Sequence, residues 1–145
     1  MFKFRFQTLL KVRKIRNDEA QQALAEAQRA CYFLQAQRDE CLSAIEGSGD
    51  ELLELFGRHV KPTEISMFYN YQRYLQHRLS ILEQRIDEAR AEVEKRREAL
   101  LKVRREYKAM ERLKEIMHGR YQAEQERLEM KAIDDMAVTR HARSE

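Results

Sequence analysis

The side chains best suited to chemistry are four histidines, two cysteines and two acidic pairs. They are His59, His77, His118, His141, Cys31, Cys41, Asp87, Glu88, Asp134 and Asp135. The histidines show no metal-ligand spacing with one another or with the cysteines, and the sequence contains no glycine-rich phosphate loop and no nucleophile elbow. We therefore expect no catalytic residue, no metal and no cofactor, which indicates a protein that is not an enzyme.

The cysteines and acidic pairs have simpler structural interpretations. Cys31 and Cys41 are ten positions apart, so on one continuous helix about 15 Å would separate them, at ~1.5 Å per residue. Because that distance is too long for a disulfide, we expect two small buried residues in a reducing compartment. The acidic pairs lie among basic neighbours and are typical of a solvated helix face.

The composition favours long helices over a packed globule. Among 145 residues, 37% are charged, and the chain holds one proline, four glycines and no tryptophan. The net charge of +3 is small beside 28 basic and 25 acidic residues, so the overall balance does not require a nucleic-acid partner. The N-terminus lacks the uninterrupted apolar region of a secretory signal, and no run approaches the ~18 apolar residues of a transmembrane helix.

Apolar residues recur about every 3.5 positions through the second half of the chain, which is typical of a coiled coil. One seam position holds Ile65, Gln72, Leu79, Ile86, Val93, Leu100, Tyr107, Lys114, Tyr121 and Leu128. The other holds Phe68, Leu75, Leu82, Ala89, Arg96, Val103, Met110 and Met117. The first half repeats the pattern more weakly at Phe6, Leu10, Ala20, Leu24, Ala27, Cys31, Leu34, Cys41 and Ile45, with interruptions at Arg13, Asn17 and Arg38.

The stretch "EGSGDELLELFGRHVKPTE" separates the two halves and holds three glycines and the only proline. It predicts a break, with a short helix that Ser48 caps and Gly57 ends, and with Pro62 in the first turn of the next helix. The predicted fold is all-α: a long antiparallel two-helix coiled coil, or helical hairpin, with a C-terminal overhang. We expect one domain over residues 1–145. Its predicted elements are a first helix at about 2–46, a turn region at about 47–62 and a second helix at about 63–140.

The lengths of the two helices differ, and this predicts the overhang. A reversal near residues 55–59 places residue 2 opposite residues 108–116, so the second helix extends roughly 30 residues further, or ~45 Å. Its seam continues through Met117, Tyr121 and Leu128. An unpaired apolar stripe needs a partner, and Gly119 is the expected weak point.

Two further surfaces are candidates for binding. The opening "MFKFRFQTLLKVRKIR" alternates six cations with apolar residues and contains no acid. It suits an acidic protein surface, although an anionic membrane or a nucleic acid would suit it on the same evidence. The stretch "SMFYNYQRYLQHRL" places Met67, Tyr71, Tyr74, Arg78 and Ile81 in a line beside the seam, as residues enriched in protein interfaces or as flanking support for the coil. Gln37 and Ala44 on the first helix are expected near this line.

Three stretches in this order resemble the flagellar export protein FliJ family across nearly the whole chain. They are "FKFRFQTLLKVRKIRNDEAQQALAEAQ", "YNYQRYLQ" and "ERLKEIMHGRYQAEQERLEMKAIDDMAVTRHAR". The resemblance implies a cytoplasmic component of the flagellar type III export apparatus, peripheral to the inner membrane at the flagellar base. Such a protein resembles the coiled-coil stalk of the rotary ATP synthase gamma subunit.

The resemblance also implies partners. It implies binding at the centre of a hexameric FliI-like export ATPase, whose assembly and activity the stalk promotes, and contact with the cytoplasmic domain of an FlhA-like export gate. It further implies handling of late-substrate export chaperones, no nucleic acid, and membrane association only through partners. The candidate ATPase-binding residues are Phe6, Leu10, Arg13, Arg16, Met117, Tyr121 and Leu128. The candidate gate-binding residues are Gln37, Tyr71, Tyr74, Arg78 and Ile81.

Three other interpretations remain open at this point. The equivalent stalk of a virulence-type secretion system would share the hairpin and differ in its partners. A basic coiled-coil module that binds nucleic acid or an anionic membrane would lose binding steeply with salt. A structural dimer would pair two overhangs with each other.

Overall fold

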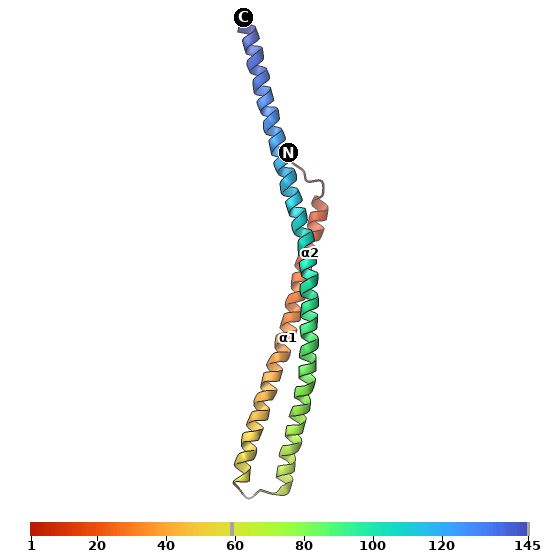
Figure 1. The fold of residues 1–145 in the computed structure, drawn as a ribbon, viewed down its shortest axis with the longest axis vertical. Helices are drawn as coiled ribbons and strands as arrows, with labels where there is room; N and C mark the ends of the chain where they lie inside the picture. The colour runs from red at the N-terminus through yellow and green to blue at the C-terminus, as the bar shows by residue number, and fades with distance from the viewer. Residues whose placement is uncertain (59, 145) are drawn as a thin grey trace. The chain divides into compact units, whose positions relative to one another are not determined.

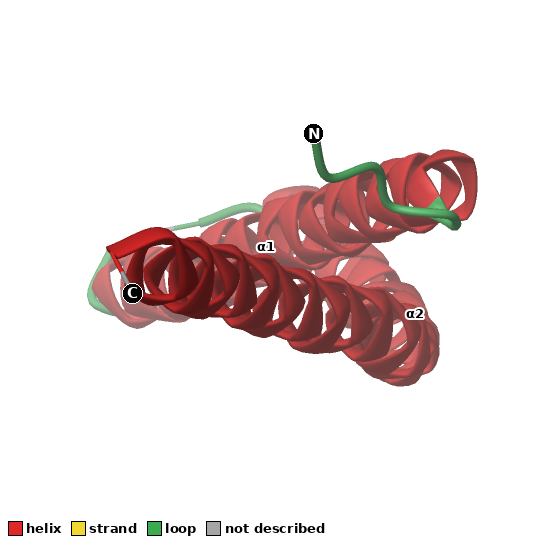
Figure 2. Ribbon diagram, turned by 90° about the horizontal axis from the view of Figure 1, so that it is seen from above, coloured by secondary structure: helices red, strands yellow, loops and turns green. Residues whose placement is uncertain are grey.

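The computed structural model describes residues 1–58 and 60–144, so the prediction made for His59 lies outside the described residues. Two helices make up the fold: α1 spans Gln7–Phe56 and α2 spans Pro62–Ser144 (Figure 1). Figure 2 shows that the described backbone outside them is confined to the N-terminal residues and to the connection between the helices. The helices run antiparallel, which confirms the predicted all-α helical hairpin coiled coil.

Contacts divide the chain into two compact units, and each unit pairs a segment of α1 with a segment of α2. The first, which we call the terminal unit, combines Met1–Glu19 with Leu101–Glu145. The second, the turn unit, is Ala20–Leu100. Because the same two helices supply both units, the prediction of a single domain stays a prediction.

The core of the turn unit follows the predicted heptads. Cys41, Leu75 and Leu82 form its buried cluster, and Ile86 is 2% exposed. Every seam position predicted between Ile65 and Leu100 is buried or half-buried. One of these seam residues is Arg96. Its Nη1 donates to the carbonyl oxygen of Ala23 at 2.7 Å, and its Nε donates to Glu92 at 2.9 Å. A cation therefore fits the seam because backbone and side-chain oxygens receive it.

The predicted break at residue 47 is wrong, because α1 continues to Phe56. The heptad explains this, since Ser48 and Leu52 follow Cys41 and Ile45 by seven residues and are both buried. Burying further seam positions offsets the cost of two helical glycines, about 1 kcal/mol each. Ser48 therefore packs in the seam and does not begin a separate short helix.

The end of α1 and the start of α2 agree with the predicted signals. The amide of Gly57 donates to the carbonyl oxygen of Glu54 at 3.2 Å, and the amide of Arg58 donates to that of Leu55 at 3.0 Å. These bonds satisfy carbonyl groups that the last helical turn leaves free. Pro62 is the first residue of α2, where its missing N–H costs nothing.

The start of α1 differs from the prediction, because the helix begins at Gln7 and not at residue 2. Phe4 is buried although it precedes the helix, and the ring of Phe2 packs edge-on against His118 with centroids 4.9 Å apart. Non-helical backbone covers up to about 3.4 Å per residue, against 1.5 Å in a helix. The chain start therefore reaches His118 and Tyr121, beyond the predicted residues 108–116.

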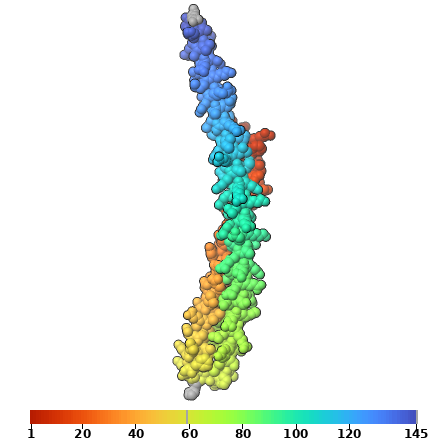
Figure 3. Space-filling view, in the orientation of Figure 1, coloured from red at the N-terminus to blue at the C-terminus, as the bar shows by residue number. Residues whose placement is uncertain are grey.

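The end of α2 forms the predicted overhang, which is shorter than expected. Every residue from Gln122 to Ser144 is exposed, a length of 23 residues. Figure 3 shows this end of α2, in blue, with no other segment against its visible face. The overhang begins later than predicted because the non-helical N-terminus extends along α2 as far as Tyr121.

Candidate partner-binding surfaces

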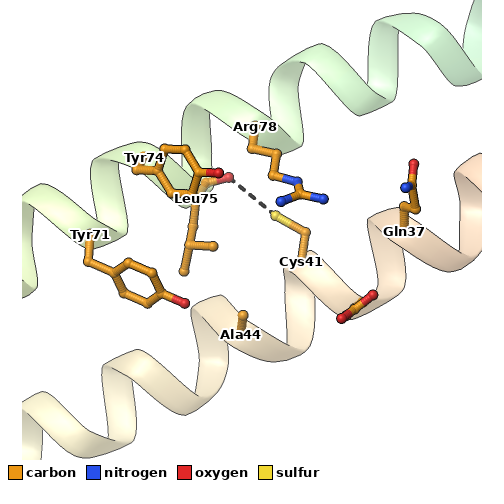
Figure 4. A pocket seen from close by; sticks show the side chains of 8 residues that line it. Gln37, Cys41, Ala44, Tyr71, Tyr74, Leu75 and Arg78 are labelled. Atoms are coloured by element: carbon orange, nitrogen blue, oxygen red, sulfur yellow. Dashed lines mark hydrogen bonds between the residues drawn. The ribbon is translucent and has the colours of Figure 1, made fainter.

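The turn unit brings the five predicted gate-binding residues together. A groove of about 160 Å³ is lined by Gln37 from α1 and by Tyr71, Tyr74 and Arg78 from α2. A second groove of about 330 Å³ shares Gln37, Tyr74 and Arg78 and adds Ile81. Figure 4 shows the α2 side chains of the first groove facing Gln37, Cys41 and Ala44 on α1.

The tyrosines of this groove are a stacked pair on one face of α2. Tyr71 and Tyr74 are three positions apart, which puts them on neighbouring turns of that face. Their rings lie 6.5 Å apart at an interplanar angle of 25°. They are 49% and 56% exposed, so about half of each residue is available to a partner.

The floor of the groove belongs to the core. The Sγ of Cys41 donates to the carbonyl oxygen of Leu75 at 3.3 Å, and both residues belong to the buried cluster (Figure 4). A weak thiol donor is satisfied here by a backbone acceptor inside the helix pair. The groove thus combines a fixed floor with an exposed aromatic rim, an arrangement suited to a protein anchor side chain.

Besides the apolar floor, three further polar side chains line these grooves without having been predicted as binding residues. Glu40 lines the first, and His77 and Arg85 line the second. Arg85 extends the line that ends at Ile81 by one more helical turn, so its spacing could have identified it. The polar types of Glu40 and His77 gave no such signal.

The terminal unit contains all seven predicted ATPase-binding residues, but it gives them different roles. Leu10 is buried against α2, and Nη1 of Arg13 pairs with Oε2 of Glu106 at 3.1 Å. These two side chains therefore hold α1 to α2. Phe6 and Arg16 are exposed and remain available to a partner.

The three candidate ATPase-binding residues on α2 also differ in exposure. Met117 and Tyr121 are half-buried, and the Met1 ammonium donates to the Tyr121 hydroxyl at 3.0 Å. Leu128 lies beyond them in the overhang and is exposed. The packing of the Phe2 ring against His118 and Tyr121 was not predicted. The alternation of aromatic and basic residues at 2–6 has the two-residue period of extended backbone and could have indicated a non-helical start.

The overhang has a mixed surface. It exposes Met130, Ile133, Met136 and Val138 in addition to Leu128. On the turn before Leu128, Nη2 of Arg127 pairs with Oε1 of Glu124 at 2.7 Å. The hydrogen bond from this guanidinium and its charge lower the pKa of the Glu124 carboxyl.

Two further properties concern the described residues of both helices together. Over the described residues, neither helix contains a stretch that is both long and apolar enough to cross a membrane. Among residues 1–58 and 60–144, no three histidine, cysteine or acidic side chains gather in a way that could hold a metal ion.

Comparison with known proteins gives a family and a fold. A family model described as "Flagellar FliJ protein" matches residues 2–145. A solved structure from Chlamydia trachomatis, described as a proposed homolog of YscO, is 22% identical with a TM-score of 0.55, and the match covers 97% of this chain and 96% of that one. At that identity the similarity establishes the fold alone. No curated protein matches the chain.

Proposed function

The chain belongs to the flagellar FliJ protein family, and from this premise we propose that it is a stalk component of the flagellar type III export apparatus. In this proposal it binds the centre of a hexameric FliI-like export ATPase and promotes assembly and activity of the ring. The family match over residues 2–145 is the observation that carries the proposal. In this proposal the ATPase ring supplies all of the catalytic groups.

The terminal unit supplies the surface for the ATPase in this proposal. Its overhang exposes a series of apolar side chains that a ring could cover, and the exposed Phe6 and Arg16 lie in the same unit. A helical pair is stiff, and each helix is about 10 Å across, which suits the central hole of a ring. The stalk would change the ATPase rate by favouring particular subunit conformations, because a ligand shifts a conformational equilibrium through its differential affinity.

The turn unit supplies the second surface. We propose that the groove rimmed by Tyr71 and Tyr74 binds the cytoplasmic domain of an FlhA-like export gate. Stacked, half-exposed tyrosines above a fixed floor are the kind of anchor that interfaces favour. Handling of late-substrate export chaperones, a cytoplasmic location and association with the membrane at the flagellar base through these partners follow from the same proposal.

An ATPase assay with the purified cognate export ATPase tests the main role. The intact chain should raise ATP hydrolysis and should have no activity alone. Removal of residues 122–145, combined with Phe6→Ser and Arg16→Gln, should abolish most of the stimulation, because these changes delete exposed contacts and leave the paired helices in place. Tyr71→Ala with Tyr74→Ala is the matched control and should stimulate normally.

Two outcomes would contradict the stalk role. One is the absence of stimulation by the intact chain at every ratio of stalk to ATPase. The other is undiminished stimulation by the variant that lacks both the overhang and the exposed residues of the opening. A virulence-type ATPase assayed in parallel would distinguish the two secretion systems, since the cognate ring should respond at the lower concentration of stalk.

A further inference from the structure

The first turns of α1 are apolar on both faces, and the hairpin uses only one of them. Leu10 is buried against α2, whereas Leu9, Val12 and Ile15 are 41%, 37% and 55% exposed. At 100° per residue, those three side chains span the side of the helix opposite Leu10. The exposed ring of Phe6 precedes them. A soluble hairpin gains nothing from this second apolar stripe, so the stripe indicates a binding surface.

Cations surround that stripe. Lys3, Arg5, Lys11, Lys14 and Arg16 are all exposed, and the first acid of the chain is Asp18. The guanidinium of Arg5 lies 5.5 Å from the centre of the Phe6 ring. Lys14, four positions after Leu10, lines a groove with Leu10 and Tyr107 and so lies on the side of α1 that faces α2. We define the outward basic face as the other four cations together with the stripe formed by Phe6, Leu9, Val12 and Ile15.

The positive charge is concentrated in this part of the molecule. Residues 1–19 and 101–121, the paired part of the terminal unit, hold thirteen lysines and arginines against five acids. That excess of eight exceeds the net charge of +3 for the whole chain, so all other residues together are net negative. Only one ion pair, Arg13 with Glu106, forms within this paired part of the described structure. An anionic partner would therefore find most of these cations free of protein carboxylates.

We propose that the outward basic face also binds an anionic lipid bilayer directly, which adds a lipid contact to the membrane association through partners that the resemblance implies. A basic helix with an exposed apolar stripe lies in the plane of a membrane surface, its apolar side chains entering the acyl boundary and its cations meeting the headgroups. A nucleic acid would use the cations and leave Leu9, Val12 and Ile15 in water. A bilayer contacts both the cations and the apolar stripe of the face. We therefore favour a bilayer over a nucleic acid as the partner.

Binding to a bilayer can be tested separately from the proposed stalk role. It needs no ATPase and no gate, so it can be measured with the full chain and lipid vesicles alone. Because Phe6 and Arg16 belong both to this face and to the proposed ATPase surface, lipid and ATPase should compete for the chain. Loss of one activity without the other would separate the two proposals.

Sedimentation of the full-length chain with vesicles tests the inference. Vesicles of phosphatidylcholine and phosphatidylglycerol should bind the chain, vesicles of phosphatidylcholine alone should bind it far more weakly, and added salt should reduce the difference. Lys11→Gln with Arg16→Gln should weaken binding about 30-fold, since each surface cation contributes roughly a factor of five to six. The matched control is Lys131→Gln with Arg140→Gln, which removes the same charge from the overhang and should bind as the unaltered chain does.

A second pair of variants tests the apolar half of the face. Leu9→Gln with Val12→Gln should weaken binding to anionic vesicles about tenfold or more, because insertion of both side chains is lost. Both residues are exposed, so the helical circular dichroism should be unchanged. Met130→Gln with Met136→Gln in the overhang should leave vesicle binding intact.

Three results would overturn the inference. The first is equal binding to neutral and anionic vesicles, and the second is undiminished binding by the variant with altered Leu9 and Val12. The third is displacement from vesicles by short duplex DNA at equimolar phosphate, which would identify the face as a polyanion-binding surface without preference for lipid.

Discussion

The tyrosine rim of the groove in the turn unit should dominate binding to the export gate. Tyr71 and Tyr74 are each about half exposed in the free chain. A tyrosine buries roughly 150–250 Å² when covered, so about 100 Å² of each remains for a partner. At about 25 cal/mol per Å², that is about 2.5 kcal/mol per ring before the costs of association. Tyr71→Ala with Tyr74→Ala should therefore weaken gate binding by at least about 30-fold.

Isothermal titration calorimetry with the gate's cytoplasmic domain provides the measurement. Tyr69→Ala is the matched control, because Tyr69 is 47% exposed, lies on the same helix and lines neither groove. It should bind the gate with nearly the affinity of the unaltered chain. The double variant should also retain its thermal midpoint within a few degrees, since the core cluster of Cys41, Leu75 and Leu82 is untouched.

Equal losses of gate affinity in Tyr69→Ala and in the double variant would show that any exposed tyrosine contributes to gate binding, whether or not it lines the groove. Unchanged affinity in the double variant would remove the groove from the gate interface altogether. A double variant that binds the gate normally and fails to stimulate the ATPase would mean that the two surfaces are exchanged.

Other predictions concern stability and are read from chemical denaturation of the full chain. Ile86→Ala should lower the free energy of unfolding by about 3 kcal/mol, because its fully buried side chain leaves a cavity; a loss under about 1 kcal/mol would contradict this packing. Gly47→Ala and Gly49→Ala should each raise it by about 0.5–1 kcal/mol, because both positions are helical and an added Cβ meets nothing within 4 Å. Destabilisation by either alanine would place a break in α1 there. Asn17→Leu should raise it by about 1 kcal/mol, since Asn17 is buried and its Oδ1 lacks a hydrogen-bond partner. A lower value would mean that Asn17 makes a polar contact in solution.

The sequence predicted the seam well because one repeat acts over many turns. Each position from Ile65 to Tyr121 is supported by neighbours seven residues away, so a single polar residue such as Arg96 does not interrupt the pattern. The grouping of Gln37 with Tyr71, Tyr74 and Arg78 also followed, because the antiparallel register fixes which turns meet.

The sequence did not predict the continuation of α1 past residue 47 or its non-helical start. At both places the local helix propensity and the packing against α2 favour different backbone conformations. Gly47 and Gly49 disfavour a helix locally, but burial of Ser48 and Leu52 in the seam outweighs that preference. The non-helical start is the opposite case, because Phe2 and Phe4 pack on α2 only when the backbone leaves the helical path. In both cases the missing information was the contact made with the other helix.

The reactivity of the two buried cysteines can be used to measure how often the helices of the turn unit separate. Cys41 lies under the tyrosine rim, and Cys31 lines a separate groove with Tyr32 and Arg90. Cys31 and Cys41 are only 6% and 5% exposed, so a thiol reagent should react with either sulfur mainly when α1 and α2 part locally, and the alkylation rate at each position should rise with the frequency of such opening. Since the chain has just these two cysteines, and both belong to Ala20–Leu100, alkylation kinetics follow the breathing of the turn unit. A partner that closes over Tyr71 and Tyr74 would slow the reaction at Cys41 more than at Cys31.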